Sequence, residues 1–192
     1  MARFSVTSIF KTIKTKLNNI KFKASNKPIP PIPEAVWRDP IYFIAFGLGS
    51  GTMPFAPGTF GTLLAIPFYL LLQPLSLSAY LTFVILFIIF SSWICNRVSR
   101  KIHEHDHPGM CIDEFTGFFV TMINAPHSWY WVLLGFVLFR LFDIWKPWPI
   151  HIIDKNVHGG FGMVLDDIVA GIFAMIVIQI LHFNQIYIAH GV

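Results

Sequence analysis

The chain has 192 residues, which leaves room for one domain and a short extension. Hydrophobic residues make up 55% of it, charged residues only 12%, and its mean hydropathy is +0.62. Soluble domains carry about a quarter charged residues, so this composition argues against an ordinary soluble protein and points to lipid as the solvent. Two cysteines are also too few for a disulfide framework.

The first 36 residues differ from the rest in charge. Eight of the fourteen Lys and Arg residues lie within residues 1–38, and the first acidic residue is Glu34. Apolar residues recur there at spacings of three and four, as on one face of a helix: Val6, Phe10, Ile13, Leu17 and Ile20. We predict that residues 1–36 form a basic extension that ends in a Pro-rich linker at 28–33. It is either an amphipathic helix on an anionic membrane surface or a disordered tail.

Three later stretches contain no Asp, Glu, Lys or Arg: 40–96, 115–139 and 168–192. About 20 apolar residues cross a bilayer core, and both Leu77–Cys95 and Ile168–Ile188 have that length. Thr59–Leu72 is shorter and contains Pro67, and a turn at Asn124–Ser128 divides the middle stretch into two half-length helices. Because strand-like alternation is weak, we predict an all-α fold, a compact bundle of membrane-embedded helices formed by residues 37–192.

The polar motifs lie between the apolar runs, and the first of them, at 47–61, is rich in glycine. Its glycines would let backbone N–H groups approach a ligand, and a helix that begins near Thr59 would present its N-terminus to an anion. Gly58, Thr59 and Gly61 are therefore candidate anion-binding residues. Glycine-rich breaks are also common in membrane helices, and no Gly-Lys-Ser/Thr follows, so this is not a Walker loop.

The second motif, Asp113-Glu114, stands at the start of an apolar run, where unpaired carboxylates are costly. Acidic residues also stabilise a helix N-terminus, which is the simpler explanation. The pair follows three alternating histidines, His103, His105 and His107. Imidazoles suit zinc or nickel, but a solvated loop also carries His and Asp and is the favoured explanation.

The third motif places Arg140, Asp143 and Lys146 three residues apart, which puts them on one face of a helix that Pro147 and Pro149 would end. A plain ladder of ion pairs explains this spacing. Alternatively, Asp143 holds a metal ion while the two cations bind phosphate oxygens.

The fourth motif is a turn, His158-Gly159-Gly160, that leads into a helix carrying Asp166 and Asp167. Adjacent aspartates can simply be helix-start charges. Taken together, however, the four motifs put carboxylates, cations and glycine turns at the mouths of apolar segments. Because Mg²⁺ binds carboxylate oxygens together with substrate phosphates, the pattern favours chemistry on the phosphate ester of a lipid.

The motifs as written resemble the phosphatidylglycerophosphatase A family over residues 37–175. The matching runs are GLGSGTMPFAPGTFGTLLAIP, HDH at 105–107, DEFTGF at 113–118, RLFDIWKPWPI at 140–150 and DKNVHGGFGMVLDDIVAGI at 154–172. The resemblance implies an α-helical fold. It also implies Mg²⁺-dependent hydrolysis of phosphatidylglycerophosphate to phosphatidylglycerol and phosphate, at the cytoplasmic face of the bacterial inner membrane.

On this basis we assign roles to the motif residues. One or two Mg²⁺ ions would be held by Asp113, Glu114, Asp143, Asp166 and Asp167, with Lys146 as a further catalytic residue. The substrate would be bound by Gly58, Thr59, Gly61, Arg140, Lys146, His158, Gly159 and Gly160. The expected partners are phosphatidylglycerophosphate and anionic membrane lipid, with no nucleic acid, and the oligomeric state is left open, as is the choice between direct water attack and a phospho-enzyme.

The topology agrees with this assignment if the short apolar segments form hairpins, because all four motifs then share one face. The excess of Lys and Arg before residue 39 would make that face cytoplasmic. The main alternative is a small ion-binding or transport protein, which would place its acidic residues near the midplane of the membrane and not at helix mouths. A purely structural membrane protein would have no use for this set of charges.

Overall fold

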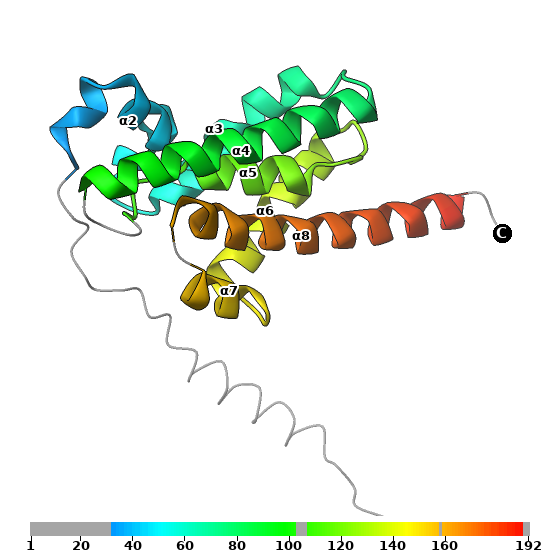
Figure 1. Ribbon diagram of the computed structural model, residues 1–192. Coiled ribbons are helices and arrows are strands. Elements are labelled where there is room, and N and C mark those ends of the chain that lie inside the picture. Colours follow the sequence, from blue (N-terminus) through cyan, green and yellow to red (C-terminus); the bar gives the residue numbers. More distant parts are fainter. Residues whose placement is uncertain (1–31, 103–106, 158, 190–192) are drawn as a thin grey trace, which may run out of the picture.

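The computed structural model of the chain describes residues 32–102, 107–157 and 159–189. Within these ranges it is entirely helical, which confirms the all-α prediction (Figure 1). The predictions for the basic extension fall largely on residues 1–31, which lie outside the described residues. The elements are η1 (Glu34–Trp37), α2 (Pro40–Ala45), η2 (Gly47–Thr52), α3 (Pro57–Leu72), α4 (Leu77–Ile102), α5 (Ile112–Thr121), α6 (Trp129–Trp145), α7 (Ile150–Asn156) and α8 (Gly160–Ala189).

Helices α3 and α4 are joined by the short turn at 73–76, where the sequence predicts the first hairpin, and both pack on α5. Pro57 opens α3, where the fixed φ of proline and its missing N–H suit the first helical position, and Pro67 lies inside the helix without ending it. Helix α4 continues past Cys95 to Ile102. The additional turns carry Arg100 and Lys101, cations that are favourable at a helix C-terminus.

Helices α5 and α6 form the second hairpin, and the predicted turn lies between them. Asn124 adopts a left-handed conformation with φ 54°. The side-chain amide of Gln179, on α8, donates to the backbone oxygens of Ile123 and Asn124 at 3.0 Å each. The turn is therefore fixed by hydrogen bonds to α8 and is not merely a gap between two apolar runs.

Helix α5 lies at the centre of the molecule, between α8 on one side and α3 and α4 on the other. All of its residues except Glu114 are buried. Its contact with α8 is close because Gly117 faces Gly171: a Cβ at Gly171 would collide with the backbone oxygen of Gly117. In Figure 1, α8 runs beneath α4 and α5 as a long rod that ends near the C-terminus.

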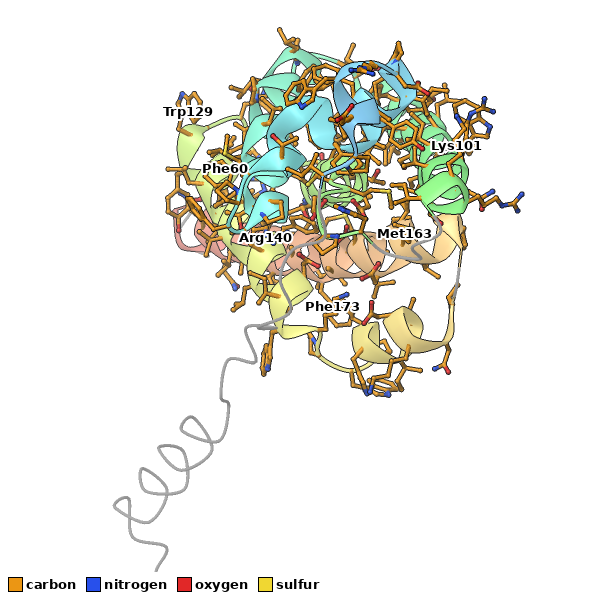
Figure 2. The ribbon with its side chains drawn as sticks, turned by 90° about the vertical axis from the view of Figure 1, so that its left-hand side faces the viewer. Phe60, Lys101, Trp129, Arg140, Met163 and Phe173 are labelled. Carbon is orange, nitrogen blue, oxygen red and sulfur yellow. The ribbon has the colours of Figure 1, made fainter. Side chains whose placement is uncertain are left out.

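Within the described ranges, two helices have the length and apolar composition of a membrane-crossing segment. They are Leu77–Ile102 and Gly160–Ile186, with mean hydropathies of 2.1 and 2.2. Only 22% and 39% of their most apolar stretches lie buried inside the protein, so most of this apolar surface faces outward. Large aromatic side chains are exposed at both ends of α6; Figure 2 shows Trp129 at the edge of the molecule, and Trp145 is exposed at the other end.

Candidate active site

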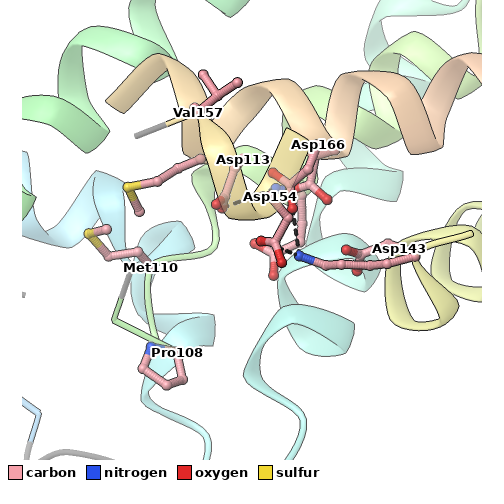
Figure 3. Close-up of a pocket in the computed structure, with 12 residues that line it drawn as sticks. Pro108, Met110, Asp113, Asp143, Asp154, Val157 and Asp166 are labelled. Carbon is pink, nitrogen blue, oxygen red and sulfur yellow. Dashed lines mark hydrogen bonds and ion pairs between the residues drawn. The ribbon is translucent and has the colours of Figure 1, made fainter. Parts of the chain in front are cut away.

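Carboxylates from three helices meet at one end of the molecule. Oxygen atoms of Asp113, Glu114 and Asp167 lie within 4.8 Å of one another, and so do oxygen atoms of Asp143, Asp166 and Asp167. Asp167 therefore belongs to both groups. Helix α5 brings its first turn to this end, α8 its second turn and α6 its last turn. Figure 3 shows Asp113, Asp143 and Asp166 around the same space.

Two cations lie within this carboxylate cluster. Arg140 Nη1 is 2.6 Å from Asp143 Oδ2 and 3.9 Å from Glu114 Oε1. Lys146 Nζ donates to Asp166 Oδ2 at 2.6 Å and to Asp154 Oδ1 at 2.8 Å. Each cation thus connects carboxylates that are far apart in the sequence.

The position of Lys146 corrects the sequence prediction for the third motif. Helix α6 ends at Trp145, and Lys146 follows it in a left-handed conformation with φ 44°. Arg140 and Asp143 do form the expected i, i+3 pair. Lys146 does not extend that ladder, because the reversed backbone directs its side chain to α7 and α8, where Asp154 and Asp166 accept its hydrogen bonds.

Asp154, on α7, is a site residue that was not assigned in the sequence analysis. It lines the same cavity as the metal-binding candidates and pairs with Lys146. Its charge was visible in the sequence at the start of the fourth motif, five residues before Gly159. Nothing in the local pattern indicates its partner, because the pairing depends on how α7 folds back over the start of α8.

The cluster surrounds a cavity of about 210 Å³. Besides the charged side chains, its wall includes Pro108 and Met110 from the segment before α5, and Val157, Gly162 and Met163 around the start of α8 (Figure 3). The wall of the cavity is therefore mostly charged, with a smaller uncharged part. A phosphate group would meet both signs of charge inside it.

The charges in the cluster do not balance without a further cation. Among the described residues, six carboxylates, those of the five metal-binding candidates and Asp154, face two cations, Arg140 and Lys146. Asp113, Asp166 and Asp167 are each less than a tenth exposed. Among the described residues, Glu114 Oε2 is buried and has no hydrogen-bond partner. Buried carboxylates in this number are unfavourable unless they are paired or bind a metal ion, so a hard divalent cation such as Mg²⁺ fits the donor set.

Burial and neighbouring charges shift the pKa values of Glu114 and Lys146. Burial raises the pKa of Glu114 to about 7, although Asp113 and Arg140 act to lower it. Burial acts to lower the pKa of Lys146, but its pairs with Asp166 and Asp154 outweigh burial and raise that pKa above its ordinary value. Lys146 therefore stays charged at neutral pH.

The start of α3 lies against the cluster. A Cβ at Gly58 would collide with Glu114 Oε1 and come within 3.2 Å of Arg140 Nη1. Gly61, one turn later, packs against Cys111, whose Cβ would lie 2.7 Å from an added Cβ. Thr59 is half-buried, and its backbone N–H donates to the oxygen of Ala56 at 2.9 Å. The structure thus brings Gly58 to the acidic cluster and places Gly61 in helix packing.

Gly159 and Gly160 of the fourth motif are not among the described residues that line the cavity, whereas Gly162 is. A Cβ at Gly160 would collide with the backbone of Ser92 and Asn96 on α4, so this glycine allows α8 to approach α4. Gly159 has φ 88° and faces open space. His158 is outside the described residues.

The histidine segment is described only at its end, since residues 103–106 lie outside the described residues. The His107 side chain is buried, and its Nδ1 accepts a hydrogen bond from the backbone N–H of Gly109 at 3.0 Å. Its ring packs on Phe46 with 5.2 Å between the ring centroids. These contacts give His107 a packing role beside the segment that leads into α5.

Comparison with known proteins agrees with the arrangement of these motifs. Residues 43–182 match the model of the family described as Phosphatidylglycerophosphatase A. The chain belongs to this family. The match covers α3 to α6, α7 and most of α8, and so includes every carboxylate of the cluster. Membership makes the chain a phosphatase, as the sequence analysis predicted.

Two relatives support the same assignment. A Phosphatidylglycerophosphatase A from Escherichia coli (strain K12) is 44% identical over 137 residues, which cover 71% of this chain and 80% of the relative. A Phosphatidylglycerophosphatase A from Haemophilus influenzae (strain ATCC 51907 / DSM 11121 / KW20 / Rd) is 38% identical over 150 residues, which cover 77% of this chain and 92% of the relative. No solved structure matches the chain.

Proposed function

We propose that this chain hydrolyses the terminal phosphate of phosphatidylglycerophosphate to give phosphatidylglycerol in phospholipid biosynthesis, with Mg²⁺ as the cofactor. The observation that carries the proposal is the cavity lined by Lys146 and by carboxylates from α5, α6 and α8, one of which, Asp143, pairs with Arg140. The names of the two relatives supply the substrate.

The metal ligands in this proposal are the two carboxylate groups that share Asp167. Asp113 and Glu114 complete one group, and Asp143 and Asp166 complete the other. The arrangement accommodates one ion or two. A bound Mg²⁺ supplies a Lewis acid that offsets phosphate charge and lowers the pKa of a bound water.

The chain's own cations hold the phosphate. Arg140 does not itself line the cavity, but it pairs with Glu114 and Asp143, which do, and its buried Nε has no hydrogen-bond partner among the described residues. Lys146 Nζ lies in the cavity and can exchange one carboxylate partner for a phosphate oxygen. Phosphoryl transfer relies mainly on positioning and electrostatic stabilisation, and these two side chains supply both. The absence of a side chain at Gly58 lets Glu114 and Arg140 pack directly against the start of α3.

The distribution of charge supports a bacterial inner-membrane location with the cavity facing the cytoplasm. Helix α4 ends beside the site region with Arg97, Arg100 and Lys101, and Lys101 is 3.7 Å from Asp39 ahead of α2. The turns at the opposite end, 73–76 and 124–128, contain no Lys or Arg. Positive charge favours the cytoplasmic side of a membrane protein.

The alternative of an ion-binding or transport protein without phosphatase activity has less support. Asp113 and Glu114 lie in the first turn of α5, and Asp143 lies in the last turn of α6. Carboxylates of a transport path are expected within the membrane interior. These lie at helix ends and are paired with cations suited to phosphate.

Phosphate release from pure phosphatidylglycerophosphate tests the proposal directly. The purified protein should release phosphate with Mg²⁺ and stop in EDTA, and added Mg²⁺ should restore the reaction. A Glu34→Gln variant is the matched control, because Glu34 is exposed and pairs only with Arg38 among the described residues. No release with Mg²⁺ would contradict the function, whereas full activity after chelation, or rescue by zinc alone, would contradict the metal assignment.

A further inference from the structure

A second cavity lies on the other side of α5 and is lined entirely by apolar side chains. It measures about 280 Å³. Its wall is formed mainly by aromatic and leucine residues of α3, α4 and α5: Phe68, Leu72, Phe83, Phe87, Phe115 and Phe119. An engineered apolar cavity of ~150 Å³ is large enough to hold benzene. This space can therefore hold a substantial length of hydrocarbon.

The wall of this apolar cavity is well packed. Phe83 and Phe87 stack with 5.6 Å between their ring centroids, and both rings contact Phe119 edge-on, at 5.5 and 5.1 Å. Phe68 and Phe115 lie 5.9 Å apart. Such ring pairs hold one another in place, so the cavity is bounded by a rigid set of aromatic side chains.

The apolar cavity opens to the outside of the bundle. Phe68 and Phe90 remain 38% and 40% exposed at its rim, and Leu71 is 76% exposed. Phe90 lies on α4, one of the helices with the composition of a membrane-crossing segment. In a bilayer this opening would face lipid chains and not water.

The first turn of α5 separates the two cavities. Asp113 and Glu114 line the polar cavity, while Ile112 and Phe115, which flank them in the sequence, line the apolar cavity. One turn of one helix thus presents carboxylates to one side and apolar side chains to the other. The distance between the cavities is on the order of a helix diameter, ~10 Å.

We propose that the apolar cavity binds one acyl chain of the phospholipid whose terminal phosphate occupies the polar cavity. This inference rests on the proposed function and adds a recognition site for the hydrocarbon part of the substrate. The molecule that joins the two cavities must carry a phosphate monoester at one end and a long hydrocarbon at the other. In phosphatidylglycerophosphate, two glycerol units and a phosphodiester connect these ends and can pass around the first turn of α5.

The chemistry of the wall favours an acyl chain over other occupants. Every residue that lines the apolar cavity is Ile, Leu or Phe. A peptide strand or a polar head group would leave its hydrogen-bonding groups unpaired there, at a cost of about 1–3 kcal/mol for each group. A saturated or monounsaturated chain has no such groups.

Two filling variants and a matched control test the inference through substrate chain length. Leu72→Trp and Leu71→Trp add bulk inside and at the mouth of the apolar cavity. Leu86→Trp makes the same change on α4 at a residue that is 61% exposed and is not among the described residues that line this cavity. Substrates are dioleoyl and dibutanoyl phosphatidylglycerophosphate, both with Mg²⁺.

The filling variants should lower kcat/KM for the dioleoyl substrate about tenfold, the scale set by small changes in an apolar pocket. The dibutanoyl substrate should be hydrolysed at the wild-type rate by all three variants, and Leu86→Trp should leave both substrates unchanged. Equal losses on both substrates, or no loss on either, would overturn the inference. Failure of the unaltered protein to hydrolyse either substrate would instead contradict the proposed function.

Photo-crosslinking of the unaltered protein provides a second test that does not depend on how the variants fold. A phospholipid with a diazirine at the end of one acyl chain is incorporated into vesicles with the protein and EDTA, and the labelled peptides are mapped. Label concentrated on residues that line the apolar cavity, such as Leu72, Phe87 and Phe119, and not on the outward-facing Leu86, supports the inference. Label spread evenly over the outward faces of α4 and α8 contradicts it.

Discussion

The two ends of the helix bundle are built on different principles. The end that carries the polar cavity, called here the site end, gathers buried carboxylates from α5, α6 and α8 around Arg140 and Lys146. The opposite end, called here the turn end, contains the turns 73–76 and 124–128, which have no Asp, Glu, Lys or Arg.

The turn end is held by neutral hydrogen bonds. Gln179 donates to the backbone of the α5–α6 turn, and the hydroxyl of Tyr80 donates to the oxygen of Phe119 at 2.8 Å. Neutral bonds of this kind satisfy buried groups without bringing a charge into an apolar region. The difference teaches that the turn end is held by neutral groups, whereas the charged groups of α5, α6 and α8 are concentrated at the site end.

The largest expected effect concerns which side of the membrane each end of the bundle faces. A cysteine at one end should be labelled from one side of the membrane and not at all from the other. Single cysteines are introduced at Asn156, near the site end, and at His127, in the turn end, in a chain whose Cys95 and Cys111 are replaced by alanine. A membrane-impermeant thiol reagent should label position 156 from the cytoplasmic side and position 127 only from the other side. Labelling of both positions from one side would show that the two ends do not lie on opposite faces of the membrane.

The next effect concerns catalysis at the site end. Asp143→Asn preserves shape but removes the charge that pairs with Arg140 at 2.6 Å, so turnover should fall by a factor of about 100 or more. Asp154→Asn is the matched control because Asp154 contacts Lys146 and is more exposed. Its loss should be clearly smaller, measured as kcat on the same lipid. Equal turnover of the Asp143 variant and the unaltered enzyme would support a purely structural ion pair.

A smaller effect is expected at Lys146. Lys146→Ala removes the cation between Asp154 and Asp166, so phosphate binding should weaken and KM should rise about tenfold, the scale of one charge-assisted hydrogen bond. Lys146→Arg keeps the charge and should recover part of the affinity. A variant that loses stability but keeps its KM would indicate that Lys146 serves only to hold α7 on α8.

The smallest effect is expected at the turn end, and it should concern stability alone. Gln179→Ala removes two hydrogen bonds to the α5–α6 turn and should lower the free energy of unfolding by about 1–2 kcal/mol, seen as a lower Tm in detergent. Turnover below the Tm should be unchanged. Gln185→Ala, an exposed change on the same helix, provides the control. A large loss of turnover in the Gln179 variant would show that the two ends are coupled.

Much of the fold could be predicted because apolar length and helix breakers are local properties of the sequence. The runs around Leu77–Cys95 and Ile168–Ile188 became α4 and α8, and the turn at Asn124–Ser128 divides α5 from α6. The hairpin arrangement then brings separate carboxylates to one end. Helix ends were less predictable, since α4 continues through Arg97 to Ile102.

The details of the site could not be predicted because they depend on contacts between helices. Lys146 ends α6 in a left-handed conformation that is unusual for a residue other than glycine, and this redirects its side chain to α7 and α8. The partner of Asp154 follows from the same reversal. Gly160 was assigned to substrate binding in the sequence analysis, whereas the structure places it against the backbone of α4. A glycine that permits helix packing and one that permits ligand approach look alike in a sequence.

The contact between Gly117 and Gly171 has a consequence for the choice of metal ion. Asp113 lies four residues before Gly117 on α5, and Asp167 lies four residues before Gly171 on α8, so each carboxylate stands about one helical turn from the contact between the two glycines. The separation of the two carboxylates is therefore determined by the direct contact between the backbones of α5 and α8. Mg²⁺ requires a small, regular shell, whereas Ca²⁺ accepts a wider and more flexible one. We expect this fixed separation of the carboxylates to favour binding of Mg²⁺ over Ca²⁺. A methyl group added at either glycine should increase the separation and weaken that preference.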